Sequence, residues 1–346
     1  MVRAFKSITA VVRLGFYIVL YCINVIRMRY FSSFTGAGGF DLAVPESWEC
    51  VGFSEIDKYT NMVLRYRFPD VKNYGDINAI KWEEIPDFEI LFGGTPCQDL
   101  SLAGKRKGLA GERSGLFYKF VEALKAKKPK YFVWENVKGA LSSNQGWDFA
   151  EVLNQFSEAG YNLWWQVLNA KYFSVPQNRE RIFIIGFRDR SPPEVFFEPE
   201  SYGRNNKEEQ ATSTIGATAY KGAGSNMMPL IEIVESEQHP QEKEITEVKS
   251  MLNLGMQGRR IKENNEPSFT LNTLGEIGIK VNSKIRRLTP KECERLMSWS
   301  DGWTRWGMDE KGNKVEMSDT QRYKMAGNGV VSNVVKWLIE NVILRD

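Results

Sequence analysis

Short apolar runs alternate with longer helix-like segments from Met28 to Phe187, and this alternation restricts the possible folds more than any other feature of the chain. Six of the runs are typical of buried strands: MRYFSSF, WECVGFSEI, FEILFGG, KYFVWENV, WWQVLNA and RIFIIGF. Between them lie segments such as GLFYKFVEALKAKK and WDFAEVLNQFSEAG, whose apolar residues recur at helical spacing. This order predicts an α/β fold with a doubly wound, mainly parallel sheet. We assign Trp164 and Trp165 to its core.

The alternation stops between residues 188 and 285, where Gly, Asn, Ser, Thr and charged residues show no sustained period. This stretch has 12 Lys/Arg and 15 Asp/Glu, so it is not a basic patch. Regular structure returns at RRLTPKECERLM, where Thr289 and Pro290 predict a helix start, and GNGVVSNVVKWLIENVIL then carries an apolar helical stripe. We therefore predict a main domain of residues 28–187 and 286–346, interrupted by a smaller, loop-rich domain of residues 188–285.

The first 27 residues contain a strongly apolar segment, LGFYIVLYCINVI, which follows Arg3, Lys6 and Arg13. No small-residue cleavage site of a signal peptide follows it, and it is short for a membrane span. A complete strand and loop begin at Met28. We interpret residues 1–27 as an extension outside the functional domain, with a membrane anchor as the alternative.

Composition limits the chemistry without defining it. The chain has 346 residues, of which 42% are hydrophobic and 26% charged, and its net charge of +3 permits an anionic partner but does not require one. The four cysteines, Cys22, Cys50, Cys97 and Cys293, include no CxxC pair. This pattern disfavours a zinc site or a disulfide framework and fits a reducing, cytoplasmic compartment. The single histidine, His239, disfavours a catalytic Cys–His pair.

Cys97 stands in GGTPCQDLS, directly after a proline in a loop that two glycines open. A cysteine kept for packing usually lies inside a helix or strand, whereas this setting is typical of an exposed, reactive thiol. A buried, inert thiol is the alternative. The next segment, KRKGLAGER, is basic and interrupted by glycines. It is typical either of a solvated loop or of a moving segment that touches phosphates.

The segment FTGAGGF, residues 34–40, lies between a predicted strand and a helical segment, and its glycines allow tight turns and close approach to a ligand. Glu55 follows at the end of the next apolar run, where an acid can hold ribose hydroxyls, and Asp76 follows a further strand-like step. A plain turn between strand and helix is the alternative. Asp41 stands where a dinucleotide fingerprint needs its third glycine, so the pocket suits a nucleoside without a pyrophosphate.

Seven blocks, FTGAGGF, SEIDKY, GDI, GGTPCQDLS, WENV, QNRERIF and KMAGNGVV, occur in the order and spacing of the C5-cytosine DNA methyltransferase family. The chain resembles this family from about Met28 to Phe187 and from Arg286 to the end, and the unmatched stretch lies where the family carries its target-recognition region. The resemblance implies a Rossmann-like methyltransferase of the bacterial or phage modification type. It also implies S-adenosyl-L-methionine as the cofactor and double-stranded DNA as the partner.

The resemblance implies that Cys97 adds to C6 of a flipped-out cytosine and that Glu135 binds the base and acts partly as a proton donor. It also implies that Arg179 and Arg181 orient and polarise the flipped base. The implied cofactor-binding residues are Phe34, Gly36, Ala37, Gly38, Gly39, Glu55, Ile56, Asp76, Ile77, Pro96, Leu116, Asn328 and Val330. The expected DNA contacts are Ser101, Lys105, Arg106, Lys107, Arg113, Thr214 and Thr270, with Leu271 as a further candidate for base reading.

Local alternatives stay open for several of these residues. Glu135 could serve as a surface acid that caps a helix, QNRERIF as a charged strand edge, and Asn328 as a helix N-cap. A tRNA cytosine-5 methyltransferase would use the same scaffold, and the net acidity of the insert favours it, whereas the length of the insert favours sequence readout in duplex DNA. A catalytically silent DNA-binding relative would need a lost nucleophile or acid. We expect a monomer without a metal, and the resemblance allows a cognate restriction endonuclease as a partner.

Overall fold

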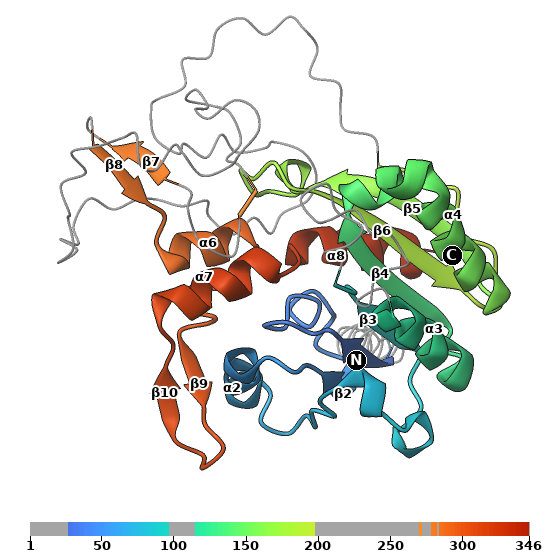
Figure 1. Cartoon of the computed structure of the whole chain (residues 1–346), viewed down its shortest axis with the longest axis horizontal. Coiled ribbons are helices and arrows are strands. Elements are labelled where there is room, and N and C mark those ends of the chain that lie inside the picture. The colour runs from blue at the N-terminus through green and yellow to red at the C-terminus, as the bar shows by residue number, and fades with distance from the viewer. Residues whose placement is uncertain (1–26, 97–114, 198–269, 272–277, 282–283, 346) are drawn as a thin grey trace, which may run out of the picture.

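A six-stranded sheet in the order β2-β1-β3-β4-β6-β5 forms the centre of the molecule in the computed structural model (Figure 1). The structure describes residues 27–96, 115–197, 270–271, 278–281 and 284–345. The strands of the central sheet are β1 (Arg29–Ser33), β2 (Glu49–Ser54), β3 (Ile90–Gly93), β4 (Tyr131–Val137), β5 (Asn162–Asn169) and β6 (Glu180–Phe187). Each of them coincides with one of the six predicted apolar runs, although β5 begins two residues and β6 one residue before its run.

Most of the sheet is parallel, but one strand is reversed. Strands β2, β1, β3 and β4 pair in parallel, whereas β6 runs antiparallel to both of its neighbours, β4 and β5. The predicted doubly wound, mainly parallel sheet is therefore confirmed. The direction of β6 is an addition, because its continuous apolar run carries no signal of strand direction.

The reversed strand determines what lies beside the end of β4. Parallel strands of an open α/β sheet gather the residues that follow them at one edge, the carboxyl edge. Because β6 runs the other way, it begins at this edge. Val137, the last residue of β4, pairs with Arg181, the second residue of β6. Strand register alone thus brings the WENV and QNRERIF blocks side by side.

Helices cover both faces of the sheet, as expected for a doubly wound fold. On one face, Phe132 of β4 contacts Phe120 and Phe156 from helices α3 and α4. The other face carries the remaining four helices of the described residues. The helices in this described part of the chain are α2 (Lys58–Arg67), α3 (Gly115–Lys127), α4 (Trp147–Glu158), α6 (Pro290–Leu296), α7 (Asp319–Asn328) and α8 (Ser332–Leu338), and α8 continues into a π-helical turn at Ile339–Ile343.

The C-terminal helices begin and pack largely as their sequence predicts. Thr289 caps α6 in a reciprocal capping box with Glu292, and Pro290 occupies the first helical turn. Cys293 is buried within this helix. The residues of the predicted apolar stripe, Val330, Val331, Val334, Val335, Leu338 and Val342, are all buried, although α8 begins only at Ser332.

Shorter elements connect this framework. They are the 3₁₀ turns η1 (Ile77–Ala79), η2 (Trp82–Glu84), η5 (Lys138–Gly146) and η6 (Ala170–Tyr172) and the two-stranded pairs β7 (Gly278–Val281) with β8 (Lys284–Arg287) and β9 (Trp306–Met308) with β10 (Lys314–Glu316). The strand-like step expected before Asp76 is reduced to a single parallel bridge between Phe53 and Asn73. Among the described residues, no helix is long and apolar enough to cross a membrane.

The start of the predicted insert packs against the main domain. Arg190 donates to the backbone carbonyl of Ile343 at 2.6 Å, and Phe197 contacts the ring of Trp337. The division into two domains stays a prediction, because most of residues 188–285 lie outside the described residues. Trp164 belongs to the core as predicted, but Trp165 is 40% exposed. The assignment of Trp165 to the core was therefore wrong, because alternation along β5 turns successive side chains to opposite faces.

Candidate active site

The glycine loop, residues 34–39, follows β1 and is tied to Glu55 at the end of β2. One oxygen of the Glu55 carboxylate accepts a hydrogen bond from the backbone N–H of Gly36 at 2.8 Å. Its other oxygen accepts from the backbone N–H groups of Ile56 and Asp57, each at 2.8 Å. The carboxylate is therefore held in one place between the glycine loop and the start of α2.

Two residues predicted to bind the cofactor lie exposed next to Glu55. Ile56 is 72% exposed, although it is a large apolar residue. Asp76 is exposed and caps η1, whose first residue, Ile77, is buried. The Ser54 hydroxyl donates to the carbonyl of Gly75 at 2.8 Å, which holds the Asp76 segment beside the end of β2. An apolar surface and two carboxylates thus share one part of the carboxyl edge.

The C-terminal segment lies directly against the glycine loop. A Cβ atom added to Gly39 would be only 2.8 Å from Cγ1 of Val330 and 2.9 Å from its carbonyl oxygen, so only glycine permits this approach. The hydroxyl of Ser332 donates to the carbonyl of Gly39 at 2.7 Å. Asn328 is exposed two residues before Val330 and ends α7. It is therefore not the N-cap of the last helix, which is Val331.

Asp41 lies buried beneath the glycine loop. Its carboxyl group accepts hydrogen bonds from the hydroxyls of Tyr30 and Ser32 on β1. Burial raises the pKa of Asp41 to about 7, and these hydrogen bonds oppose the shift. Above it, Phe34 and Gly38 have φ angles of 50° and 85°, in the left-handed region that non-glycine residues seldom adopt. The residue that breaks the dinucleotide pattern thus connects the loop to the strand below it.

Glu135 and Arg181 meet at the carboxyl edge of the sheet, on β4 and β6. Their side chains are 15% and 17% exposed, and Arg181 Nε lies 3.0 Å from Glu135 Oε1. That buried oxygen receives no hydrogen bond of good geometry from a described residue. A Cβ atom added to Gly94 would lie 3.0 Å from the other oxygen, Oε2, so the start of the GGTPC loop passes close to the carboxyl group.

Thr95, the residue before Pro96, is held by the two residues that flank Glu135. Trp134 Nε1 donates to the Thr95 hydroxyl at 3.0 Å, and Asn136 Nδ2 donates to the Thr95 carbonyl at 3.4 Å. Thr95 is buried, whereas Pro96 is exposed. Neighbours of Glu135 therefore hold the backbone that leads towards Cys97.

Arg179, two residues before Arg181, hydrogen-bonds backbone carbonyls of other segments and makes no ion pair with Glu135. It is 3% exposed, and its Nη2 donates to the carbonyls of Gly327 at 3.2 Å and Gly329 at 2.6 Å. Burial and the charge of Arg181 lower the pKa of Arg179 to about 9. Its guanidinium therefore holds the two residues that flank Asn328, and its Nε is buried without a partner among the described residues.

A buried glutamine that the sequence analysis did not select joins the end of the insert to the main domain. Gln177 accepts from the backbone N–H of Leu271 at 3.0 Å and donates to the carbonyl of Leu296 at 2.8 Å. The Thr270 hydroxyl donates to the Asn178 carbonyl at 2.6 Å. Leu271 is itself 3% exposed, which leaves no edge for base reading. Its QNR context was the signal that could have identified Gln177.

The remaining predicted residues are distributed as follows. Leu116 lies half-buried at the start of α3. Ala37 is buried within the glycine loop. The residues Cys97, Ser101, Lys105, Arg106, Lys107, Arg113 and Thr214 lie outside the described residues. Among the described residues, no group of three His, Cys, Asp or Glu side chains could hold a metal ion.

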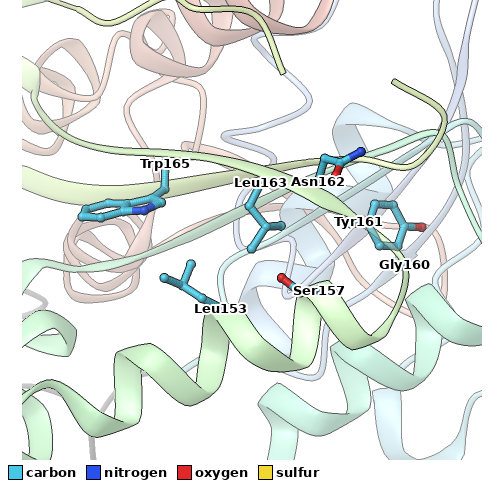
Figure 2. Close-up of a pocket in the computed structure, with 7 residues that line it drawn as sticks. All are labelled: Leu153, Ser157, Gly160, Tyr161, Asn162, Leu163 and Trp165. Atoms are coloured by element: carbon cyan, nitrogen blue, oxygen red, sulfur yellow. The ribbon is translucent and has the colours of Figure 1, made fainter. Parts of the chain in front are cut away.

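A surface groove lies between α4 and β5 (Figure 2). Its lining residues are Leu153, Ser157, Gly160, Tyr161, Asn162, Leu163 and Trp165. The groove residues of the sheet lie on the edge strand β5, which β6 separates from β4. At the usual strand spacing, β5 is about 10 Å from the strand that carries Glu135. The groove is therefore not part of the candidate site.

Two solved methyltransferase structures share this fold. The Entamoeba histolytica methyltransferase EhMeth aligns with a TM-score of 0.61 at 17% identity, over 91% of this chain and 97% of its own. The Schizosaccharomyces pombe Dnmt2 methyltransferase (S. pombe Dnmt2) aligns with a TM-score of 0.60 at 18% identity, over 90% and 97%. These identities are low, so the two structures establish the fold alone.

Sequence comparison identifies the family. The profile of the C-5 cytosine-specific DNA methylase family matches residues 28–344. The type II methyltransferase M.HhaI of Haemophilus parahaemolyticus is 32% identical over 91% of this chain and 94% of its own length. The orphan methyltransferase M.SPRI of Bacillus phage SPR is 28% identical over 92% and 98%. The chain belongs to the C5-cytosine DNA methyltransferase family, as the seven blocks predict, and its activity is that of a DNA (cytosine-5-)-methyltransferase.

Proposed function

We propose that the chain uses S-adenosyl-L-methionine to methylate C5 of a flipped-out cytosine in a specific duplex DNA sequence, with Cys97 as the nucleophile. One arrangement carries this proposal. The ion pair of Glu135 and Arg181, the anchored GGTP segment and the glycine loop with Glu55 all lie at the carboxyl edge of a single sheet. A base and a cofactor held at this edge would meet between β1 and β4.

The residues of the glycine loop fit the cofactor. Glu55 is fixed by three backbone N–H groups and can accept hydrogen bonds from ribose hydroxyls. The exposed Ile56 offers an apolar surface for adenine, and Asp76 can accept from its amino group. Asp41 replaces the glycine that a pyrophosphate would need, which suits a nucleoside carrying a short chain. When bound, S-adenosyl-L-methionine supplies the methyl group.

Cys97 begins the reaction on the base. Its thiolate forms a bond to C6, and the electron pair moves to C5, which becomes nucleophilic enough to accept the methyl group. Transfer of the methyl group to C5 would leave S-adenosyl-L-homocysteine. Water then takes the proton from C5, the electron pair of that C–H bond restores the C5–C6 double bond, the S–C6 bond breaks and the thiolate is released. Two residues span at most about 7 Å, so the anchored Thr95 keeps Cys97 within reach of a base bound at Glu135.

Glu135 holds the base through N3 and the exocyclic amine. It donates a proton to N3 while the thiolate adds to C6 and takes it back when the thiolate leaves, so no charge accumulates on the ring. Arg181 fixes the carboxyl group from 3.0 Å while leaving Oε1 without a well-aligned hydrogen bond, which is what an oxygen awaiting a base requires. Arg179 donates hydrogen bonds to the residues on either side of Asn328 and so supports the C-terminal segment proposed to contact the cofactor. A monomeric state and a cognate restriction endonuclease stay predictions.

The proposal is tested by transfer of labelled methyl groups from S-adenosyl-L-methionine to duplex DNA and to tRNA, with Cys97→Ala in parallel. We expect label in DNA for the wild type and none for the variant, and mapping of the modified cytosines then gives the target sequence. Label in tRNA alone would mean that the protein is a tRNA cytosine-5 methyltransferase. No label in either, from protein that still binds S-adenosyl-L-homocysteine, would identify a silent relative.

A further inference from the structure

The glycine loop has a buried hydrogen-bond partner far along the chain, Trp303. The indole Nε1 of Trp303 donates to the carbonyl of Ala37 at 2.7 Å, across 266 residues of sequence. Trp303 is 9% exposed and Ala37 is 1% exposed, so water cannot readily replace either group. The C-terminal part of the chain thus gives the loop a buried indole donor on Ala37, in addition to the Ser332 hydroxyl on Gly39.

The ring of Trp303 also supports the loop indirectly. Phe68 packs edge-on against it with ring centroids 6.0 Å apart. A Cβ atom added to Gly38 would lie 3.1 Å from Phe68 Cε2, so Phe68 packs directly beneath the loop. Trp303 therefore acts on the loop at two neighbouring positions, through the N–H on Ala37 and through Phe68 on Gly38.

Charged groups fix the backbone of Trp303. The fully buried carboxylate of Glu294 accepts from the N–H groups of Gly302 and Thr304, the residues on either side, each at 2.8 Å. Arg67 donates to the carbonyls of Gly302 at 2.7 Å and of Trp303 at 2.9 Å. Its guanidinium also lies 4.4 Å from the centre of the Trp303 ring. The indole is therefore held before any ligand arrives.

We propose that Trp303 is a positioning residue that keeps the glycine loop in its cofactor-binding conformation. This inference depends on the proposed role of the loop in binding S-adenosyl-L-methionine. Phe34, at the start of the loop, holds a φ of 50°, a conformation that costs a non-glycine residue free energy and that surrounding contacts must maintain. If the hydrogen bond on Ala37 is lost, a smaller fraction of molecules holds the binding conformation, and the apparent affinity falls by that fraction.

The test compares Trp303→Phe, which keeps an aromatic ring but removes the N–H donor, with Trp306→Phe. Trp306 is a matched control because its ring lies in β9 beneath Lys314 and Arg305. The dissociation constant of S-adenosyl-L-homocysteine is measured by titration calorimetry, the affinity for duplex DNA by fluorescence anisotropy, and the melting temperature alongside. Steady-state kinetics separate KM for the cofactor from kcat.

We expect Trp303→Phe to weaken S-adenosyl-L-homocysteine binding about tenfold and to raise KM for the cofactor equally. Its DNA affinity and kcat should stay within about twofold of wild type, and Trp306→Phe should change nothing. Unchanged cofactor affinity in Trp303→Phe would overturn the inference. So would an equal loss of cofactor and DNA affinity, since that pattern indicates general destabilisation.

A second variant covers the case in which Trp303→Phe does not fold. Benzothienylalanine at position 303 has the shape of tryptophan with sulfur in place of the ring N–H. The cofactor and DNA affinities of this variant then test the inference in the same way as those of Trp303→Phe. The failure of this inference is distinct from the failure of the proposed function. Wild-type protein that binds no S-adenosyl-L-homocysteine would refute the proposed cofactor and this inference together. Equally tight binding of S-adenosyl-L-homocysteine by wild type and by the variants at position 303 would refute only the role of Trp303.

Discussion

On the cofactor side of the site, the glycine loop is held by side chains 266 and 293 residues further along the chain, whereas on the base side Glu135 and Arg181 meet across neighbouring strands. The base side therefore needs only the correct pairing of β4 with β6. The cofactor side needs the C-terminal helices to close onto the first strand. We conclude that substitutions on the base side should impair chemistry, and those on the cofactor side should impair affinity and stability together.

The two acids of these regions illustrate the contrast. Glu135 lies at the rim of the site with an arginine 3.0 Å away. Asp41 is buried beneath the loop, and its hydrogen bonds come from the uncharged hydroxyls of Tyr30 and Ser32. Burial raises the pKa of Asp41 to about 7, so it can remain protonated where a surface aspartate is ionised. Under the proposed function, Glu135 takes part in the reaction, whereas Asp41 connects the glycine loop to β1.

The largest effect is expected for Glu135→Gln, because an amide cannot donate and recover a proton at the base. We expect kcat to fall about 10³-fold while the affinity for S-adenosyl-L-homocysteine stays unchanged. The measurement is single-turnover methyl transfer together with calorimetry. The matched control is Glu180→Gln, which removes an exposed carboxylate that pairs with Lys138 at 3.0 Å. Retention of more than a tenth of the activity by Glu135→Gln would contradict the assigned role.

Asp41→Asn should change how stability depends on pH. Between its ordinary pKa near 4 and about 7, the unfolded chain releases a proton that the folded chain keeps. The contribution of Asp41 to the free energy of unfolding is therefore fully present below about pH 4 and is lost as the pH rises towards 7, by up to about 4 kcal/mol. Burial raises the pKa values of Tyr30 and Cys50 as well, so these neighbours stay neutral throughout.

Urea unfolding of both proteins at several pH values tests this. Asparagine does not titrate, so the difference in unfolding free energy between wild type and Asp41→Asn isolates the carboxyl group. We expect that difference to favour wild type most at pH 4 and to shrink, or to reverse in sign, by pH 7.5. A difference that is constant across this range would mean that Asp41 ionises normally.

Gly39→Ala should affect the cofactor side moderately. The added methyl group would meet Val330 at 2.8 Å, so the loop and the C-terminal segment must separate. We expect a loss of about 1–3 kcal/mol of unfolding free energy and about tenfold weaker binding of S-adenosyl-L-homocysteine. Gly312→Ala at the β9–β10 turn provides the control, because its φ of 82° strains alanine by backbone conformation while no atom lies within 4 Å of the added methyl group. Equal cofactor affinity in both variants would contradict this account of the loop.

The smallest effect is expected for Lys324→Met. Lys324 pairs with Asp57 between α7 and the start of α2, and its side chain is 46% exposed. Exposed ion pairs contribute less than about 1 kcal/mol, so stability and cofactor affinity should change little. Thermal melting and calorimetry measure both. A tenfold loss of cofactor affinity would show that this pair belongs to the cofactor side after all.

The features that could be predicted from the sequence are those that local sequence determines. The six strands and the capped start of α6 could be predicted because local periodicity and capping residues determine them. The meeting of Glu135 with Arg181 followed from the resemblance, but the reversal of β6 that produces it has no local signal. Asp41 was evident only as a missing glycine, since a buried hydrogen-bond network depends on packing that the sequence does not display.

The C-terminal contacts were the least predictable. Nothing near Trp303 marks it as a partner of Ala37, because the contact joins segments 266 residues apart. Glu294 lies in α6, whose sequence predicts only a capped helix. Its carboxylate nevertheless accepts hydrogen bonds from the backbone N–H groups of both neighbours of Trp303. Such contacts depend on how whole elements pack, whereas strands depend on their own periodicity.

The most direct test of the central claim, that Cys97 attacks a base held at Glu135, is covalent trapping. Duplex DNA made with 5-fluorocytosine in place of every cytosine is incubated with the protein and S-adenosyl-L-methionine. Fluorine cannot leave C5 as a proton does, so the adduct should accumulate. We predict a stable protein–DNA complex, mapped to Cys97 by peptide mass spectrometry and absent in Cys97→Ala. An adduct on another residue, or none from protein that methylates ordinary cytosine, would contradict the account.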